Sequence, residues 1–149
     1  MNNAELSLKR SELHARNDIA GAIPLQREIL RRLEEHGRPP RDIANAHNYL
    51  SVLYAKSKEY AMAEDHARQA LALHTPEDTL PSHDALACYS MVLARILVQS
   101  QRRAEAIPFA ETALREWTIV HNPMNDFLRA RMAELTALRS GTWTGDFNT

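Results

Sequence analysis

The sequence predicts an all-α fold, and three observations carry that prediction. Only 4 glycines occur in 149 residues, which leaves few positions of unusual backbone freedom. Alanine, leucine, glutamate and arginine dominate the composition, and all four are good helix formers. Valine, isoleucine and threonine are scattered singly, and no run alternates polar and apolar side chains with the period of two expected of a strand.

The composition excludes several classes of function. Apolar residues are 44% and charged residues 25% of the chain, as in ordinary globular domains. The net charge of −1 gives no general attraction to nucleic acid or to an anionic membrane. Cys88 is the only cysteine, so an intrachain disulfide and a cysteine-rich zinc site are excluded. Apolar stretches are too short to span a bilayer, and the first residues lack the apolar segment of a secretory signal, so we expect a cytoplasmic protein.

Helix-breaking residues divide the chain into about seven helices. Gly37 with Pro39 and Pro40, the stretch 75–82, and Asn122-Pro123 mark the longer connections. The expected helices are 3–16, 18–36, 40–57, 59–74, 82–100, 102–121 and 124–139. We expect a single domain over residues 1–140, followed by a tail of residues 141–149.

Two sets of residues recur with a period near 42. They are Asp42, Asp84 and Asp126 in the odd-numbered helices, 42 residues apart, and Ala22, Ala63 and Ala106 in the even-numbered helices, 41 and 43 apart. The three aspartates are expected near helix starts, where an acid meets the positive end of the helix dipole. A period of this size predicts stacked helical hairpins.

Two prolines support the same frame. Pro24 and Pro108 are the third residues of AIPLQREIL and AIPFAETAL, and Asp65 stands at the equivalent position of the middle copy. Proline inside a helix costs about 3 kcal/mol, and less near the helix start, where fewer backbone bonds are lost. The shared position therefore predicts one repeated hairpin with its proline early in the second helix.

The segment DIANAHNYLSVLYAKSKEYAMAEDHARQALAL, from Asp42 to Leu73, resembles a tetratricopeptide repeat (TPR) of the long, 42-residue subtype found in kinesin light chains and many bacterial proteins. The matching residues are Leu50, Ser51, Tyr54, Tyr60, Ala63, Glu64, Ala70 and Leu71, then Leu93, Ala94, Leu97, Ala106, Ala113 and Leu114, and, in the first unit, Ile19, Ala22, Ile29 and Leu30. Lys9 and Arg10 depart from the pattern, since leucine and a small residue are expected there. The resemblance covers residues 18–138.

This resemblance implies a right-handed α-α superhelix, a TPR-like solenoid of three helical hairpins (3–36, 40–74 and 82–121) and a C-terminal capping helix (124–139). In the capping helix, the apolar residues at helical spacing should face the core and the charged residues should face water. The apolar set is Phe127, Leu128, Met132, Leu135 and Leu138, and the charged set is Arg129, Arg131, Glu134 and Arg139.

No catalytic or cofactor site is expected. Ser82, His83 and Asp84 are the residue types of a catalytic triad, but adjacent residues cannot align for proton relay. The chain has no glycine-rich phosphate loop and no HExxH sequence. Cys88 has no clear base at helical spacing beside it and is interpreted as a packing residue. His66 and His74 would offer two ligands to a metal completed by a partner, but we favour two ordinary half-exposed histidines. We therefore predict that the protein is not an enzyme and binds no metal or other cofactor.

Nucleic-acid binding is also disfavoured. Arginines crowd residues 27–41 and recur at Arg102-Arg103, yet acids interleave with the first group and aromatic residues are few. A solvated helical face is the favoured interpretation.

In TPR arrays the first helix of each pair lines a concave groove that holds a partner's peptide or helix. By resemblance, the partner-binding residues here are Asn45, Asn48, Tyr49, Val52, Lys56, Cys88, Met91, Val92, Arg95 and Gln99, with Ser7, Ser11 and His14 added by the first helix. Asn48 would bind the ligand backbone, and Lys56 and Arg95 would pair with an acid. Tyr49, Val52, Met91 and Val92 would form an apolar floor. The lysine and asparagine set with which chaperone-binding TPR domains hold a C-terminal carboxylate is absent.

The tail, SGTWTGDFNT, carries Trp143 and Phe147 after two glycines. It could fold back on the capping helix, dock into the groove of a neighbouring copy, or remain disordered.

The sequence therefore predicts a protein–protein interaction scaffold or adaptor, with no nucleic-acid or membrane partner and with the identity of its protein or peptide partner open. The alternative is a self-associating structural protein, a homodimer formed through the first helix or the aromatic tail. A third interpretation is that the groove residues only solvate a small scaffold.

Overall fold

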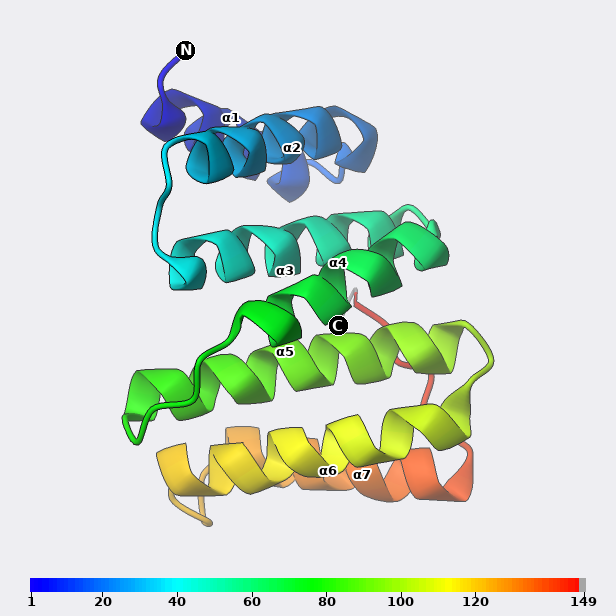
Figure 1. Ribbon diagram of the computed structural model, residues 1–149. Coiled ribbons are helices and arrows are strands. Elements are labelled where there is room, and N and C mark those ends of the chain that lie inside the picture. Colours follow the sequence, from blue (N-terminus) through cyan, green and yellow to red (C-terminus); the bar gives the residue numbers. More distant parts are fainter. Residues whose placement is uncertain (148–149) are drawn as a thin grey trace. The chain divides into compact units, whose positions relative to one another are not determined.

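A computed structural model describes residues 1–147 of the chain, and this part contains seven α-helices and no strand (Figure 1). The helices are α1 (Asn3–Ala15), α2 (Ile19–Glu35), α3 (Pro40–Lys56), α4 (Tyr60–Leu73), α5 (Leu80–Gln99), α6 (Arg103–Val120) and α7 (Asp126–Ser140). Every boundary lies within two residues of the predicted one, so the all-α prediction is confirmed. The prediction for tail residues 148–149 falls outside the described residues. No described helix is both long and apolar enough to cross a membrane.

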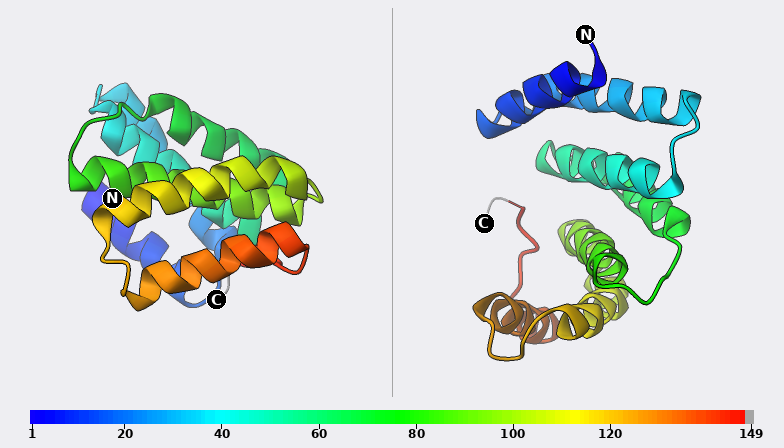
Figure 2. Two further views of the ribbon diagram at one scale, coloured as in Figure 1. Left: turned by 90° about the horizontal axis from the view of Figure 1, so that it is seen from below. Right: turned by 90° about the vertical axis from the view of Figure 1, so that its left-hand side faces the viewer.

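The chain forms two compact units, an N-terminal unit (Met1–Leu73) and a C-terminal unit (His74–Thr149). In the N-terminal unit, α1 packs on α2, α2 on α3 and α3 on α4. In the C-terminal unit, α5 packs on α6, and α6 packs on α7. Helices that follow one another within a unit lie side by side in the views of Figures 1 and 2. Each unit is therefore built from helical hairpins, and the single domain predicted for residues 1–140 remains a prediction.

The turn inside each hairpin has the same backbone conformation. Its central residue has a positive φ, at 60° for Asn17, 65° for Lys58 and 63° for Gln101. The following N–H donates to the carbonyl five residues earlier: Asp18 to Leu13 (2.8 Å), Glu59 to Tyr54 (2.9 Å) and Arg102 to Leu97 (2.8 Å). This is the Schellman pattern that ends many helices. The three turns are spaced by 41 and 43 residues, as the periodic alanines are, so the predicted repeat frame is present in the backbone.

Small residues and prolines hold equivalent positions in the hairpins. Ala22, Ala63 and Ala106 are each 0% exposed, which lets the backbones of paired helices approach closely. Pro24 and Pro108 lie inside α2 and α6, each five residues after the first helical residue. The prediction of one shared proline position is confirmed.

One of the three periodic aspartates does not lie at a helix start. Asp42 and Asp126 occupy the first turns of α3 and α7. Asp84 does not, because α5 begins at Leu80, two residues before the predicted start, and is capped by Thr79. Asp84 instead accepts a hydrogen bond from the indole Nε1 of Trp117 at 3.0 Å. Its expected interaction with the helix dipole is therefore replaced by a tie between α5 and α6.

The capping helix α7 follows its predicted pattern only in part. Leu128, Leu135 and Leu138 are buried, whereas Phe127 is 37% exposed and Met132 is 48% exposed. Arg131 and Glu134 were expected to face water but are half-buried. They lie in an ion-pair network with Arg95 of α5, which a helix considered alone could not reveal.

The repeated turn gives a stability prediction. Replacing Lys58 by glycine should raise the free energy of unfolding by about 0.5–1 kcal/mol, because an L-residue pays to adopt a left-handed conformation that glycine adopts freely. Asn17→Gly is the matched control and should gain less, since asparagine tolerates this conformation better. Urea denaturation followed by circular dichroism measures both changes. A destabilised Lys58→Gly chain would contradict the assigned turn.

Candidate functional site

The predicted partner-binding residues lie on two helices, one in each unit. The helix α3 carries Asn45 to Lys56, and α5 carries Cys88 to Gln99. Asn45 is exposed and Met91 is buried at 4% exposure, whereas the other eight are half-buried. Met91 therefore has little surface left to contribute to an apolar floor.

On the α5 face, the tail lies against the helix. Gly141 ends α7 with φ 83°, and residues 142–147 then run back without secondary structure of their own (Figure 1). We call residues 142–147 the tail segment. Side chains of α5 and α6 donate to three of its backbone carbonyls: Arg95 Nη1 to Asp146 (2.6 Å), Gln99 Nε2 to Gly145 (2.5 Å) and Arg103 Nη1 to Trp143 (2.9 Å). Two of these three donors belong to the predicted site, and Arg103 was not predicted.

Aromatic contacts and a glycine complete this arrangement. The Arg95 guanidinium carbon lies 5.3 Å from the centre of the Trp143 ring and 5.8 Å from that of Phe147, within the range of cation–π attraction. Gly145 is buried, with φ +69°, and a Cβ atom there would lie 2.8 Å from the Arg95 carbonyl oxygen. Only glycine fits this position without strain, because any side chain would meet the α5 backbone.

The charge of Arg95 is held in place by neighbouring groups. Its Nη2 lies 3.4 Å from Glu134, and Glu134 also pairs with Arg131 at 2.6 Å. Burial lowers the pKa of Arg95 and the positive Arg131 adds to this, while Glu134 and Asp146 oppose it. A guanidinium pKa begins so high that Arg95 stays charged, as a partly desolvated donor aimed at the tail segment.

Of the three alternatives for the tail, residues 142–147 take the fold-back, but on a different surface from the one expected. The side-chain contacts run to α5 and α6 rather than to the body of the capping helix. Only the end of α7 takes part, where the Ala137 carbonyl accepts the N–H groups of Thr142 and Trp143. The capping helix is the nearest element in sequence. The tail segment nevertheless binds to the half-buried Arg95 of α5, which donates a hydrogen bond to its backbone.

On the α3 face, four polar side chains form a chain of contacts. The Arg10 guanidinium carbon lies 4.0 Å above the centre of the Tyr49 ring. The Tyr49 hydroxyl lies 2.8 Å from His14 Nδ1, and His14 Nε2 lies 2.8 Å from Lys56 Nζ. An ammonium can only donate, so Nε2 accepts and the imidazole proton lies on Nδ1, toward Tyr49. We call Arg10, His14 and Lys56 the cation cluster.

A buried glutamine supports the cation cluster from α2. Gln26 is 1% exposed, accepts from Arg10 Nη1 at 2.8 Å and donates to the Ala46 carbonyl at 3.1 Å. Arg10 Nη2 also donates to Ser11 at 3.1 Å. Sequence reasoning identified Tyr49, Lys56 and His14 but noted Arg10 only as a departure from the TPR pattern. That departure was the available signal for the site, because a long, positively charged side chain stands where the repeat pattern has a small residue that packs beside the second helix.

The two charged groups that shift the pKa of His14 are both positive. Burial is the largest cause that lowers its pKa, and the charges of Lys56 and Arg10 lower it further. Among residues 1–147, no carboxylate contributes to this shift.

Asn48 of α3 and Cys88 of α5 are both half-buried. The Asn48 side-chain oxygen is buried and has no hydrogen-bond partner among the described residues. Burial, with a smaller contribution from Asp84, raises the pKa of Cys88 to about 11. Its thiol is therefore protonated at neutral pH, which suits a packing residue.

The residues Ser82, His83 and Asp84 each engage a different partner. Ser82 Oγ accepts from the Glu77 N–H at 3.0 Å. His83 lies 3.1 Å from Asp78 and 2.6 Å from Glu116, and these two acids raise its pKa. Because Asp84 binds Trp117, the three side chains do not form a relay.

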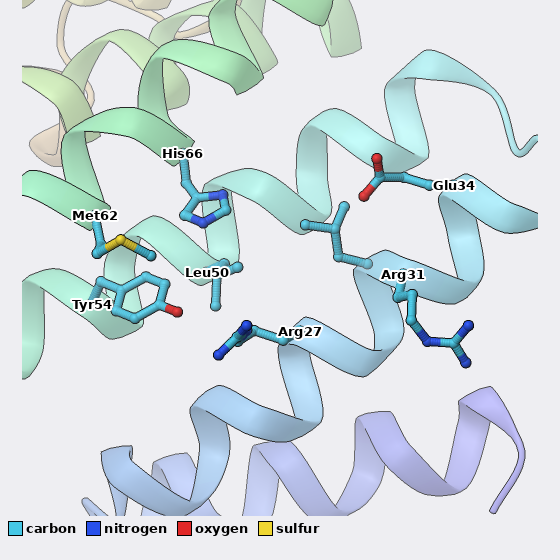
Figure 3. A pocket seen from close by; sticks show the side chains of 8 residues that line it. Arg27, Arg31, Glu34, Leu50, Tyr54, Met62 and His66 are labelled. Atoms are coloured by element: carbon cyan, nitrogen blue, oxygen red, sulfur yellow. The ribbon is translucent and has the colours of Figure 1, made fainter.

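A pocket of about 340 Å³ opens in the N-terminal unit between α2, α3 and α4 (Figure 3). In Figure 3, Arg27 extends toward Tyr54, whereas Arg31 points away from it. His66 stacks on Tyr54, and its Nδ1 lies 2.9 Å from that of His47. The residues lining the pocket are Arg27, Leu30, Arg31, Glu34, Leu50, Tyr54, Met62 and His66.

The two histidines considered as metal ligands have separate neighbours. His66 pairs with His47, and the His74 ring lies edge-on to Tyr89 at 6.0 Å. Within residues 1–147, no group of three or more His, Cys, Asp or Glu side chains could hold a metal ion.

Comparison with known proteins identifies no family. No protein-family model matches the chain, and no curated protein matches it with significance. A function for this chain therefore has to be inferred from the geometry of the two faces.

The His47–His66 pair predicts a loss of stability in acid. Burial lowers the pKa of both residues below 6.5, so the unfolded chain takes up protons first as the pH falls. The free energy of unfolding should be highest above pH 6.5 and should decrease below it until the folded pKa values are passed. His66→Gln should flatten this decrease, while His36→Gln, at an exposed position, should leave it unchanged. Urea denaturation over a pH series measures this pH dependence of the free energy of unfolding. An equally steep decrease in His66→Gln and in the wild type would contradict the pairing.

A second prediction concerns the tail segment. Gly145→Ala should release it from α5, because the new Cβ would meet the Arg95 carbonyl and the residue would be strained at positive φ. Acrylamide quenching of tryptophan fluorescence reports the release, since Trp117 is only 4% exposed and Trp143 would become accessible. Thr144→Ala changes an exposed neighbour and should leave quenching as in wild type. Equal quenching in both variants would contradict the docked tail.

Proposed function

We propose that this protein is an interaction scaffold, an adaptor that binds a peptide of another protein along the α5 face. One observation carries the proposal: α5 and α6 already hold a segment of this chain by its backbone. Arg95, Gln99 and Arg103 donate to three carbonyls within four consecutive residues, Trp143 to Asp146. Backbone carbonyls occur in every peptide, so the same donors suit a segment from another chain.

The contacts of the tail segment indicate the chemistry of the ligand. Two aromatic rings lie near one guanidinium, and a glycine between them lies against the helix backbone. A matching ligand is an extended peptide with an aromatic residue, a glycine two positions later and a second aromatic residue two positions after that. Val92 and Cys88 precede Arg95 by three and seven residues, so they extend the same helical face. The tail segment would then act as an internal competitor.

We further propose that the hairpins stack as a right-handed TPR-like superhelix in a cytoplasmic protein. The repeated turn, the buried alanines at the same period and the added helix α7 support this arrangement. In that arrangement the odd-numbered helices would line one wall, so the α3 residues would add to the binding surface. The proposed partner-binding set remains Asn45, Asn48, Tyr49, Val52, Lys56, Cys88, Met91, Val92, Arg95 and Gln99.

The second candidate function is self-association by exchange of tails. The contacts that hold the tail segment involve Arg95, Gln99 and Arg103, and the same segment of a second copy could make them equally well. Light scattering across a concentration series separates the two functions. A strict monomer at high concentration would contradict tail exchange and leave the adaptor function in place.

Peptide binding to the full-length Gly145→Ala chain tests the adaptor function. The probe is a fluorescent peptide with the sequence TWTGDFNT, residues 142–149, and anisotropy measures its affinity. The variant should bind the peptide at least about tenfold more tightly than wild type, because an attached tail competes at an effective concentration of roughly millimolar. Adding Arg95→Ala should abolish binding, while adding Arg115→Ala, at an exposed position of α6, should not. Absence of binding to a helical Gly145→Ala chain would refute the proposal.

A further inference from the structure

We infer that the cation cluster of the N-terminal unit binds a carboxylate, and that His14 takes up a proton when it does so. The inference rests on the proposed function only for the source of the carboxylate, an acidic residue of the partner's peptide. The site is formed by α1 and α3, with support from α2, and none of its residues belongs to the tail segment.

The first argument is charge. Arg10 and Lys56 carry positive charges that act on His14, and neither has an ion pair with an acid among residues 1–147. Elsewhere in the same unit, Arg31, Arg32, Arg38 and Arg68 are each paired with a carboxylate three or four residues away. The groups that face His14 are Arg10 on its own helix and Tyr49 and Lys56 on α3, while Gln26 of α2 reaches Arg10. No carboxylate on these three helices contributes to the pKa shift of His14, so the positive charges of Arg10 and Lys56 act on it without compensation.

The second argument is the number of open donors. Lys56 has three N–H groups and uses one on His14. Arg10 uses one N–H of Nη1 on Gln26 and one of Nη2 on Ser11, which leaves one N–H on each of these two nitrogens, and its buried Nε–H has no partner among the described residues. The remaining donors surround a histidine and a tyrosine that already share their own hydrogen bond. A carboxylate supplies only acceptors, and charge-assisted hydrogen bonds are the strong ones.

The third argument is that the site is already ordered. Gln26 is buried and fixed at the Ala46 carbonyl, the Tyr49 ring lies under Arg10, and the Tyr49 hydroxyl positions His14. A ligand therefore does not pay to immobilise these side chains, a cost that often removes the gain from surface ion pairs.

Proton uptake follows from the position of Lys56. In the free protein, Lys56 donates to His14 Nε2, and the nearby positive charges together with burial keep the imidazole neutral. A carboxylate that accepts from Lys56 would bring a negative charge beside Nε2. It would favour a proton there, so that Nε2–H and the ammonium both donate to the anion. The pKa of His14 should then rise, and binding should strengthen as the pH falls, by up to about tenfold per pH unit for one proton.

The test uses the full chain and acetate as the probe. Proton NMR titration of the His14 imidazole, assigned with a His14→Gln variant, is compared in sodium acetate and in sodium chloride at equal ionic strength. Acetate should raise the pKa of His14 relative to chloride. Lys56→Gln should remove that difference, whereas Lys58→Gln, an exposed lysine two residues away, should preserve it.

Three results would overturn the inference. They are an equal pKa of His14 in both salts, an unchanged difference in Lys56→Gln, and a rise with inorganic phosphate but none with acetate, which would assign the site to a different anion. Because the readout is confined to His14, it is independent of peptide binding at α5. Acetate binding without TWTGDFNT binding would leave this site in place while refuting the proposed function, and the reverse result would refute this site alone.

Discussion

The close approach of paired helices at small residues is the constraint on which the rest of this fold depends. Ala22, Ala63 and Ala106 are fully buried at one position of each hairpin, and a larger side chain there would separate the two helices. The left-handed turn residue five positions earlier in each hairpin sets where the second helix begins. Together, the turn and the alanine fix which face of each first helix is covered and which remains available to other groups.

The sequence predicts this framework well because the framework is local and periodic. Helix boundaries follow from prolines, glycines and caps, and the repeated alanines and prolines are visible as spacings. Asp84 is the exception: its spacing is correct, but its role depends on Trp117, 33 residues away, which offers an indole N–H. A helix start can be shifted by two residues when a better cap, here Thr79, lies just ahead of it.

The candidate sites were predictable only in outline. The resemblance to TPR repeats predicted that Tyr49, Lys56, Arg95 and Gln99 lie on the groove-lining face of the first helix of each pair. It could not indicate which groups these side chains contact. Arg10 meets Gln26 and Tyr49, and Arg95 meets the tail segment 51 residues later, through long side chains that have no periodic signature. Arg131 and Glu134 were assigned to water for the same reason, because their partner Arg95 belongs to another helix.

The two faces show what half-buried cations require in this protein. Arg95 is partly desolvated, and it contacts Glu134, the Asp146 carbonyl and two aromatic rings. Its neighbours Gln99 and Arg103 donate to two further carbonyls of the tail segment. Arg10 and Lys56 contact Gln26, Tyr49 and His14, yet neither forms an ion pair with a carboxylate among residues 1–147. Burial of a charge without a partner is unfavourable, and this chain avoids it at Arg95 with the carboxylate of Glu134 and a backbone carbonyl of its own tail segment. The same physical requirement at the cation cluster therefore points to an acceptor from outside the chain.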